Sequence, residues 1–577
     1  MNVLANGLWA LSSQPAAALF RRATHHVEEV QREKLLGLLR ANEDSAYGHR
    51  YGFQDIHSAG AYQERVPLAD YDSLRPWLQR VEQGEPAVLT SERVQLLEPT
   101  SGSSSATKLI PYTNTLKREF QAGIAPWVAL TFGRHRALLR GKSYWSVTPL
   151  LPGRRHSPGG IPIGFEEDSE YLSSLSGRVV RTLSAVPPEV KLIEDLDSFR
   201  YVTLLFLLRS KGLSLISVWN PTFLMLLLEP LCEWGYRLAL DIAGGSMTPP
   251  VALPPDVQSR LQESNLPQPV RALEIERILG SRAAAGTDDE RGRLHRRLWP
   301  QLTLISCWAD AAAAPYAARL ARLFPQAVVQ AKGLVSTEAF VSFPVPGLTG
   351  GALSLNSHFF EFIPIRDEGI TEADDARWRA SADDGPPILA HELVCGRHYS
   401  VVVTTGGGLY RYRTNDRIEV TGHLNGCPLI RFVGREDAVS DWFGEKLNEQ
   451  HVARALDSVC ARLALTPEFA MLACDDKRSP PAYTLYIQAA SADDAQLAAL
   501  ARSLDAAFHD NYHYAYCRRM GQLDMLSIFR VEGDATSSYL RAASGRKQRV
   551  GDVKPSLLSR HGGWSQVFAG RRIAPSS

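Results

Sequence analysis

A short segment rich in hydroxyl groups is the first part of the chain whose residue types could do chemistry. It reads PTSGSSSATKLIP over residues 99–111, follows the strand-like run VQLLE, and comes before a predicted helix. Backbone N–H groups and hydroxyls around a glycine bind phosphate oxygens, and Lys108 adds a positive charge. The GxxxxGK[ST] spacing of a P-loop is missing. The segment therefore predicts a phosphate-binding loop of another type, with a plain serine-rich turn as the alternative.

A second segment, KGLVSTE over residues 332–338, comes just after the strand-like run AVVQ. A glycine turn at the end of a strand, followed by hydroxyl and carboxylate groups, suits a nucleotide site at the carboxyl edge of a sheet. The Glu338 carboxylate could hold Mg²⁺ together with phosphate oxygens. The alternative is the start of a helix, with Ser336 or Thr337 as its cap.

Two further segments complete the set. GLYRYRTND, residues 408–416, ends in Asp416, which could accept hydrogen bonds from both ribose hydroxyls of a nucleotide. A surface turn that closes a hairpin is the alternative. GRED at 434–437 is followed by GEKLNE at 444–449, and this pair could also be an ordinary charged linker.

The order and spacing of these segments carry more information than any one of them. A Ser/Thr/Gly loop with a lysine, a turn ending in Ser-Thr-Glu, an aspartate after a Tyr-Arg run and GRxD at a domain junction are the layout of adenylate-forming enzymes. The runs TSGSSSATKLIPYT, LISCWAD, KGLVSTEAF, FEFIP, GLYRYRTND and FVGREDAVSDWFGEKLNE resemble the Gretchen Hagen 3 family of acyl acid amido synthetases in its bacterial form. The resemblance extends from about Leu96 to Pro555.

The resemblance implies roles for particular residues. The ATP phosphates would be bound by Ser101, Ser103, Ser104, Ser105 and Lys108. Thr337 would lie near the α-phosphate and Glu338 on Mg²⁺, while Asp416 would hold the ribose and Arg435 would contact the nucleotide. The candidate catalytic lysines are Lys554, which precedes Pro555, together with Lys108 and Lys446; Lys547 competes with Lys554.

The resemblance also implies a reaction. The enzyme would use ATP and Mg²⁺ to activate a carboxylic acid as an acyl-adenylate, then condense it with an amine, by default an amino acid, releasing AMP and pyrophosphate. An acyl-CoA ligase, or a nucleotide-binding protein without catalysis, are the alternatives. The acid is not specified by the sequence. Aromatic residues between the first two segments are either core residues or candidates for its binding site: Trp145, Trp219, Phe223 and Trp308.

This chain departs from the family pattern at two places. The phosphate loop reads SSSAT where relatives often have a threonine or a glycine-rich version, and Asn415 stands where a glycine is commoner. Neither change removes a hydroxyl, lysine or aspartate that the reaction needs. Asparagine tolerates left-handed backbone better than most residues, so we expect the second change to be mild.

The elements that must position these residues predict an α/β fold. Helical periodicity marks residues 24–40 and 116–130, and strand-like SLISVWN is followed by helical PTFLMLLLEPLCEWGY. Residues 244–271 are rich in Pro, Gly and Ser and predict an exposed connection. We expect a large N-terminal adenylation domain, 1–433, with mixed β-sheets flanked by helices. A hinge at 434–437 and a smaller, mobile α+β domain, 438–577, would follow.

Composition excludes several other classes of protein. The 577 residues are 45% hydrophobic, and 63 Lys+Arg against 62 Asp+Glu leave a formal charge of +1. That balance gives no general field for nucleic acid or an anionic membrane. The seven cysteines are scattered and contain no CxxC pair, which fits a reducing cytoplasm. The apolar runs are far shorter than the roughly 20 residues of a membrane helix. We expect a cytoplasmic enzyme, monomeric by default, without membrane span or obligatory protein partner.

Overall fold

The computed structural model describes most of the chain, and the statements below refer to the following residues: 2–100, 108–146, 156–164, 183–280, 287–310, 313–365, 387–435, 439–475, 478–533, 535, 538–539, 542, 557–559 and 561–573. The chain forms two compact units. The larger contains residues 1–99 and 109–434, and the smaller contains residues 435–577 together with 100–108. Each unit is described by itself.

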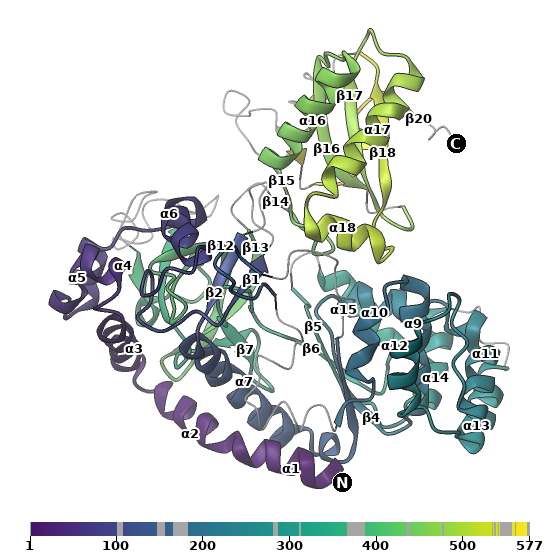
Figure 1. The fold of residues 1–577 in the computed structure, drawn as a ribbon, viewed down its shortest axis with the longest axis horizontal. Coiled ribbons are helices and arrows are strands. Elements are labelled where there is room, and N and C mark those ends of the chain that lie inside the picture. Colours follow the sequence, from purple (N-terminus) through teal and green to yellow (C-terminus); the bar gives the residue numbers. More distant parts are fainter. Residues whose placement is uncertain are drawn as a thin grey trace. The chain divides into compact units, whose positions relative to one another are not determined.

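The larger unit contains a four-stranded parallel sheet in the order β3-β4-β5-β6. Its strands are β3 (Lys142–Trp145), β4 (Leu213–Ser217), β5 (Leu304–Cys307) and β6 (Val328–Ala331). Every residue of β4 and β5 is buried, as expected for parallel strands covered on both faces. One set of helices stands beside this sheet in Figure 1: α9 (Leu196–Arg209), α10 (Pro221–Leu228), α11 (Leu231–Gly244), α12 (Pro255–Gln262), α13 (Pro269–Leu279), α14 (Asp288–Leu298) and α15 (Ala314–Leu323).

The N-terminal helices run along the larger unit (Figure 1). They are α1 (Asn2–Ser12), α2 (Gln14–Ala23), α3 (Val27–Ala41), α4 (Ala46–Tyr51), α5 (Ala59–Arg65), α6 (Tyr71–Glu82) and the long α7 (Asn114–Arg134). Trp9 of α1 and Phe20 of α2 are buried, so this end of the chain packs as helices against the core. α3 and α7 lie where the helical periodicity predicts them.

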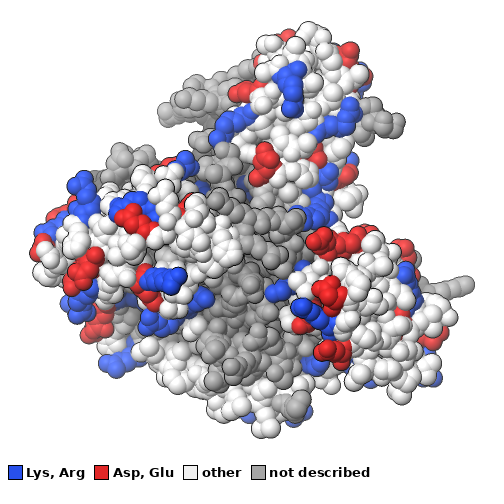
Figure 2. Space-filling view, viewed as in Figure 1, with Lys and Arg blue, Asp and Glu red and all other residues white. Residues whose placement is uncertain are grey.

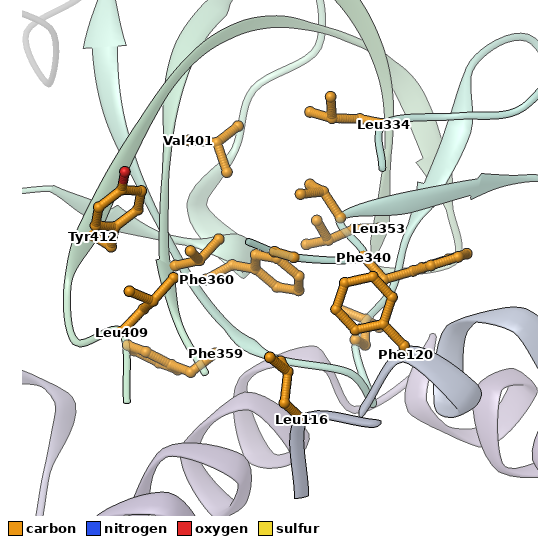
Figure 3. Close-up of a cluster of buried hydrophobic side chains, with 14 of the residues drawn as sticks. Leu116, Phe120, Leu334, Phe340, Leu353, Phe359, Phe360, Val401, Leu409 and Tyr412 are labelled. Atoms are coloured by element: carbon orange, nitrogen blue, oxygen red, sulfur yellow. The ribbon is translucent and has the colours of Figure 1, made fainter. Parts of the chain in front are cut away.

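A second, seven-stranded sheet in the larger unit carries most of the chemistry-bearing segments. Its order is β10-β9-β11-β12-β13-β8-β7. The strands are β7 (Ser342–Pro344), β8 (Gly351–Leu353), β9 (Phe359–Ile365), β10 (Ile388–Leu389), β11 (His398–Thr404), β12 (Tyr412–Leu424) and β13 (Cys427–Arg435). Figure 3 shows Leu116 and Phe120 of α7 facing Phe340, Leu353 and Phe360 across a buried cluster. Helix α7 therefore closes one face of this sheet.

The smaller unit has a five-stranded mixed sheet in the order β19-β16-β17-β18-β20. Its strands are β16 (Phe469–Asp475), β17 (Ala482–Gln488), β18 (Asp524–Val531), β19 (Leu558–Ser559) and β20 (Gly570–Ile573), and a two-stranded ladder joins β14 (Val439–Ser440) and β15 (Leu447–Asn448). Its helices are α16 (Glu449–Leu463), α17 (Asp494–Phe508) and α18 (Tyr512–Arg519). Together with the larger unit, this mixture of sheets and helices confirms the predicted α/β fold class.

The described surface carries both signs of charge. On the face drawn in Figure 2, Lys and Arg side chains are interspersed with Asp and Glu.

Among the described residues, no helix is both long enough and apolar enough to span a bilayer.

Candidate active site

The hydroxyl-rich loop connects the two strands of one small sheet. These strands are β1 (Leu96–Thr100) and β2 (Lys108–Tyr112). Strand β2 was not predicted, and the helix expected after this segment is α7, which begins at Asn114. Lys108 is the first residue of β2, and the next residue, Leu109, donates its N–H to the Tyr71 hydroxyl over 3.0 Å. The predicted phosphate ligands Ser101, Ser103, Ser104 and Ser105 lie outside the described residues.

The Ser-Thr-Glu segment forms a tight hairpin turn. Gly333 has φ +80°, and a Cβ there would lie 2.4 Å from the Ser342 carbonyl oxygen, so only glycine fits this approach. A β-bridge joins Val335 to Phe340, and the Ser336 N–H donates to the Ala339 carbonyl over 3.0 Å. No helix follows, so the alternative in which this segment caps a helix is wrong. Thr337 and Glu338 stand half-buried at the tip.

The first segment touches the second. Tyr112, which ends the run TKLIPY, is fully buried, and its hydroxyl donates to the Thr337 carbonyl over 2.6 Å across 225 residues of sequence. The neighbouring Thr113 hydroxyl donates to the Gly406 carbonyl over 2.8 Å. Gly406 begins the glycine turn that leads to the Asp416 segment. Three segments that are far apart in sequence therefore meet around Tyr112 and Thr113.

A buried polar chain holds the other side of the turn. The Phe340 N–H donates to Nε2 of His358 over 3.0 Å, and Nδ1 of His358 lies 3.0 Å from an Oε2 of Glu119. Because Nε2 accepts, the proton sits on Nδ1 and the imidazole is neutral. His358 and Glu119 are 0% and 2% exposed. Neither residue was predicted from the sequence, although His358 directly precedes the FFEF run.

The negative charge of Glu119 in this buried network is balanced by neighbouring groups. Burial on its own raises the pKa of Glu119, but His358, Lys34 and the Gly406 N–H bring that pKa below its usual range. The Lys34 ammonium lies 3.3 Å from Oε1 of Glu119, and the Gly406 N–H donates to Oε2 over 2.8 Å. Burial lowers the pKa of His358 despite Glu119. The carboxylate therefore stays ionised and the imidazole neutral, which keeps Nε2 free to accept from the turn.

A glycine lets helix α7 approach the turn closely. A Cβ on Gly123 would lie 2.1 Å from Cδ1 of Phe340, so any side chain there would displace the Phe340 ring. Phe120, one turn earlier on α7, packs edge-on against the same ring with centroids 6.1 Å apart. The turn is thus held by a hydrogen bond at Thr337 and by both the backbone and the side chain of Phe340.

Asp416 is positioned by a bulge inside strand β12. The register of β12 against β11 shifts between Ser400 and Val402, which leaves residues 414–416 opposite Val401. Asn415 has φ +60°, so the left-handed conformation expected of this asparagine is confirmed. The Asp416 N–H donates to the Thr414 hydroxyl over 3.2 Å, and Asp416 is buried. Asp416 therefore lies within a strand, not at a turn that closes a hairpin.

Arg411, in the segment that contains Asp416, and Glu361, in the FEFIP run, form a buried ion pair that stabilises the structure around β12. Arg411 Nε lies 3.1 Å from both carboxylate oxygens of Glu361, and Arg411 also donates to the Gln63 and Val66 carbonyls. Burial raises the pKa of Glu361 even with Arg411 beside it. Arg411 takes φ +47°, which is rare for a side chain of this size. A single charge within the apolar run FFEFIPI is the sequence signal that could have identified this pair.

Two of the aromatic candidates lie at the carboxyl edge of the parallel sheet. Trp219 follows β4 and Trp308 follows β5; the Trp308 N–H donates to the Trp219 carbonyl over 2.8 Å, and the two rings are 6.2 Å apart. Trp145 instead packs against Trp127 and Trp9, and Phe223 is buried on α10.

The smaller unit positions Lys446 through a buried carboxylate. Glu445 accepts N–H bonds from Trp442 over 2.9 Å and from Phe443 over 2.7 Å, and it contacts the Tyr483 hydroxyl. Lys446 follows with φ +45°, and its carbonyl accepts from the Asn511 amide over 3.1 Å. Burial raises the pKa of Glu445, and repulsion from Asp441 raises it further.

Of the other candidates of the smaller unit, the structure describes only Arg435. Arg435 ends strand β13 and opens the smaller unit. Lys547 and Lys554 lie outside the described residues.

The residues around the turn suit one metal ion in the presence of phosphates. Among the described residues, no three His, Cys, Asp or Glu side chains gather into a metal-binding group. Mg²⁺ commonly binds through one or two carboxylates plus substrate phosphates, so a single half-buried carboxylate such as Glu338 fits that mode.

Comparison with solved structures shows what this architecture is. The chain superposes on an acyl acid amido synthetase GH3.15 in complex with 2,4-DB with a TM-score of 0.63, 18% identity, and coverage of 97% of this chain and 96% of that one. A 2-hydroxyisobutyryl-CoA ligase in complex with its acyl-AMP and CoA gives a TM-score of 0.50 at 11% identity, covering 90% and 92%. The fold is that of the adenylate-forming enzymes.

Family models and curated relatives narrow the class. Residues 16–329, 351–435 and 450–562 match the N-terminal, central and C-terminal domains of the GH3 family. The chain belongs to the GH3 family, and the predicted resemblance is confirmed. An indole-3-acetic acid-amido synthetase GH3.8 of Oryza sativa subsp. indica is 26% identical over 80% of this chain and 76% of its own length. The GH3.10 synthetase of Arabidopsis thaliana is 24% identical over 89% of both.

Proposed function

We propose that this chain is an ATP-dependent ligase that joins a carboxylic acid to an amino acid through an acyl-adenylate. The observation that carries the proposal is the contact between Tyr112 and Thr337, which brings the phosphate-loop strand to the Ser-Thr-Glu turn. The relatives that match most of the chain are described as amido synthetases, and this supports an amine acceptor over CoA.

The first half-reaction follows from the groups gathered at the turn. The acid's carboxylate oxygen attacks the α-phosphorus of ATP, the bond to the bridging oxygen breaks, and pyrophosphate leaves with its electrons. Negative charge grows on the phosphate oxygens, and we assign its stabilisation to Lys108, the loop serines and Thr337. Asp416 would orient the ribose through its hydroxyls. Mg²⁺, held by Glu338 and the phosphates, supplies further positive charge when bound.

In the second half-reaction a neutral amine attacks the acyl carbon. The C–O bond to AMP breaks, AMP leaves, and the amine gives up one proton. We assign Lys554, or Lys547 in its place, and Lys446 to this site from the smaller unit, with Arg435 on the nucleotide. We propose a domain at 1–433, a hinge at 434–437 and a domain at 438–577, because two half-reactions require two placements of the lysines. The seven cysteines are free thiols, which supports a cytoplasmic enzyme. We propose no obligatory protein partner.

The test is release of AMP and pyrophosphate from ATP and Mg²⁺ with a panel of carboxylic acids, with amino acids or CoA added. Acid-dependent AMP that rises with an amino acid, with an amide found by mass spectrometry, supports the proposal. Lys108→Ala and Glu338→Ala should each lower adenylation at unchanged circular dichroism. Acceleration by CoA without amide would make the chain a thioester-forming ligase, and bound ATP without any acid-dependent AMP would make it a non-catalytic nucleotide-binding protein.

A further inference from the structure

A lysine outside the assigned site residues stands at the carboxyl edge of the parallel sheet. Lys332 directly follows β6, and its N–H donates to the Cys307 carbonyl over 3.0 Å, which continues the sheet ladder past the strand. Its ammonium crosses β5 to donate to the Ser217 hydroxyl over 2.6 Å and lies 5.0 Å from the ring centroid of Trp219. A cation over an indole face is attracted by the ring quadrupole. Lys332 is therefore fixed in place over Trp219.

A second hydroxyl on the same face has no partner. In the register of the parallel sheet, Ser217 pairs with Ser306 and Ser306 with Gln330, so these three side chains share one face. Ser306 is 1% exposed, and within the described part of the chain its hydroxyl makes no hydrogen bond. A buried hydroxyl without a partner is costly unless something else satisfies it. The Ser306 hydroxyl is therefore available to bond a ligand group or a water molecule.

The surroundings of these donors are aromatic. Trp219 is 36% exposed even though it is a large apolar side chain, and the Trp308 ring lies beside it. On the face shared by Ser217 and Gln330, Trp145 pairs with Ser217, and the Trp127 indole N–H donates to the Gln330 amide oxygen over 3.1 Å. The carboxylate that follows β5, Asp310, interacts electrostatically with Arg431. The cluster therefore combines an ammonium and two hydroxyls with flat apolar surfaces.

We propose that Lys332, Ser217 and Ser306 form the part of the acyl-acid site that binds an oxygen on the ring of an aromatic acid, with the ring against Trp219 and Trp308. This proposal deepens the proposed function and rests on it. Ligands of α/β sheets bind at the carboxyl ends of the strands, where all five residues lie. Thr337 follows Lys332 by five residues, beyond the end of the strand, so the cluster lies toward the sheet while the reacting carboxylate lies at the turn.

Selectivity should follow from the donors. A site whose buried polar groups hydrogen-bond a substrate oxygen discriminates strongly against the analogue that lacks it, because the donors are then left unpaired. We expect the enzyme to prefer 4-hydroxyphenylacetate over phenylacetate and 4-hydroxybenzoate over benzoate, by at least tenfold in kcat/KM for the acid.

The experiment measures acid-dependent ATP–pyrophosphate exchange for these two pairs of acids, in the wild type and in Lys332→Met and Ser306→Ala. Both substitutions should reduce the preference for the hydroxylated acid at least tenfold, mainly through its KM, with little change for benzoate and phenylacetate. Ser306→Ala is informative because it removes no bond within the protein, so a merely structural role predicts no effect. Lys142→Met is the matched control: this half-buried lysine lies on the same sheet at its other edge.

Each outcome decides the inference. An unchanged preference, or an equal fall for both members of each pair, would overturn the proposal, and so would a wild type that activates other acids but none of these four. In the last case the proposed function stands while the subsite assignment fails. If no acid at all supports exchange although ATP binds, the proposed function itself fails.

Discussion

Replacing His358 tests whether the buried chain behind the Ser-Thr-Glu turn positions the turn or only stabilises the fold. His358→Leu removes the acceptor of the Phe340 N–H and one partner of the buried Glu119 carboxylate. An orphaned backbone N–H costs roughly 1–3 kcal/mol, and loss of a hydrogen bond to a charged group about 1.5–3 kcal/mol. We therefore expect the free energy of unfolding to fall by about 3–5 kcal/mol.

His358→Leu should lower kcat/KM for MgATP even under conditions where the variant is fully folded. Without the bond from the Phe340 N–H, the tip of the hairpin keeps the Tyr112 bond to Thr337 and the packing of the Phe340 ring, but its backbone is held less firmly. A displacement of about 1 Å at a reacting group can cost about 100-fold in rate. We expect kcat/KM for MgATP to fall about 10- to 100-fold, which corresponds to roughly 1.4–2.7 kcal/mol of transition-state stabilisation. The milder Glu119→Gln keeps an acceptor for His358 and should show a smaller effect in the same direction.

His295→Leu is the matched control for this prediction. His295 is also a buried histidine; its Nδ1 bonds the Leu323 carbonyl at 2.9 Å and its ring stacks on Phe324, on elements that do not carry the turn. The assay combines urea unfolding with ATP–pyrophosphate exchange at varied MgATP, at a temperature where both variants are folded. If both variants lose the same stability and the same kcat/KM, or if His358→Leu leaves kcat/KM unchanged, the positioning role is refuted.

Three further predictions follow from buried charges and from the junction. Arg411→Met leaves the Glu361 carboxylate buried without its cation, so the free energy of unfolding at pH 7 should fall by about 3–5 kcal/mol. Burial raises the pKa of Glu361, so urea titrations should show this deficit shrinking as the pH is lowered, and a deficit that grows would contradict the prediction. Burial lowers the pKa of His295 to about 4, so its contribution to stability is complete above about pH 6.5 and is lost as the pH falls toward 4. The thermal unfolding temperature should fall less steeply between pH 7 and 4 for His295→Gln than for the wild type. Parallel curves would show that this histidine does not cause the pH dependence of stability. Asp437 lies outside the described residues, within the proposed hinge. Asp437→Pro fixes φ and should slow amide formation more than pyrophosphate exchange, whereas equal loss of both would remove the proposed hinge role.

The local elements were predictable because each has its own periodicity or punctuation. The run AVVQ before Gly333 marked strand β6, and Asn415 in place of glycine marked a left-handed position that β12 contains. Strand β2 was missed because KLIPY is only five residues long, contains a proline, and is followed at once by a strong helix signal. Short apolar runs of this kind are ambiguous from sequence alone.

The contacts that join the segments could not be predicted from local pattern. Tyr112 meets Thr337 across 225 residues, and His358 meets Glu119 across 239. Nothing in the sequence around Glu119 distinguishes it from a surface position of an amphipathic helix, since its burial depends on a strand that comes much later in the chain. The sequence therefore supports predictions of which residues contact a nucleotide, but it does not reveal the side chains that hold those residues in place.

The close approach of Gly123 to Phe340 has a consequence for inhibitors. Because α7 and the turn are packed together without space for even a methyl group, the turn offers a rigid surface to any ligand. A compound that contacts only Thr337 and Glu338 should bind with the same affinity in both stages of the proposed reaction. Under the proposed hinge at 434–437, a compound that also contacts the smaller unit should instead bind one stage of the cycle more tightly than the other.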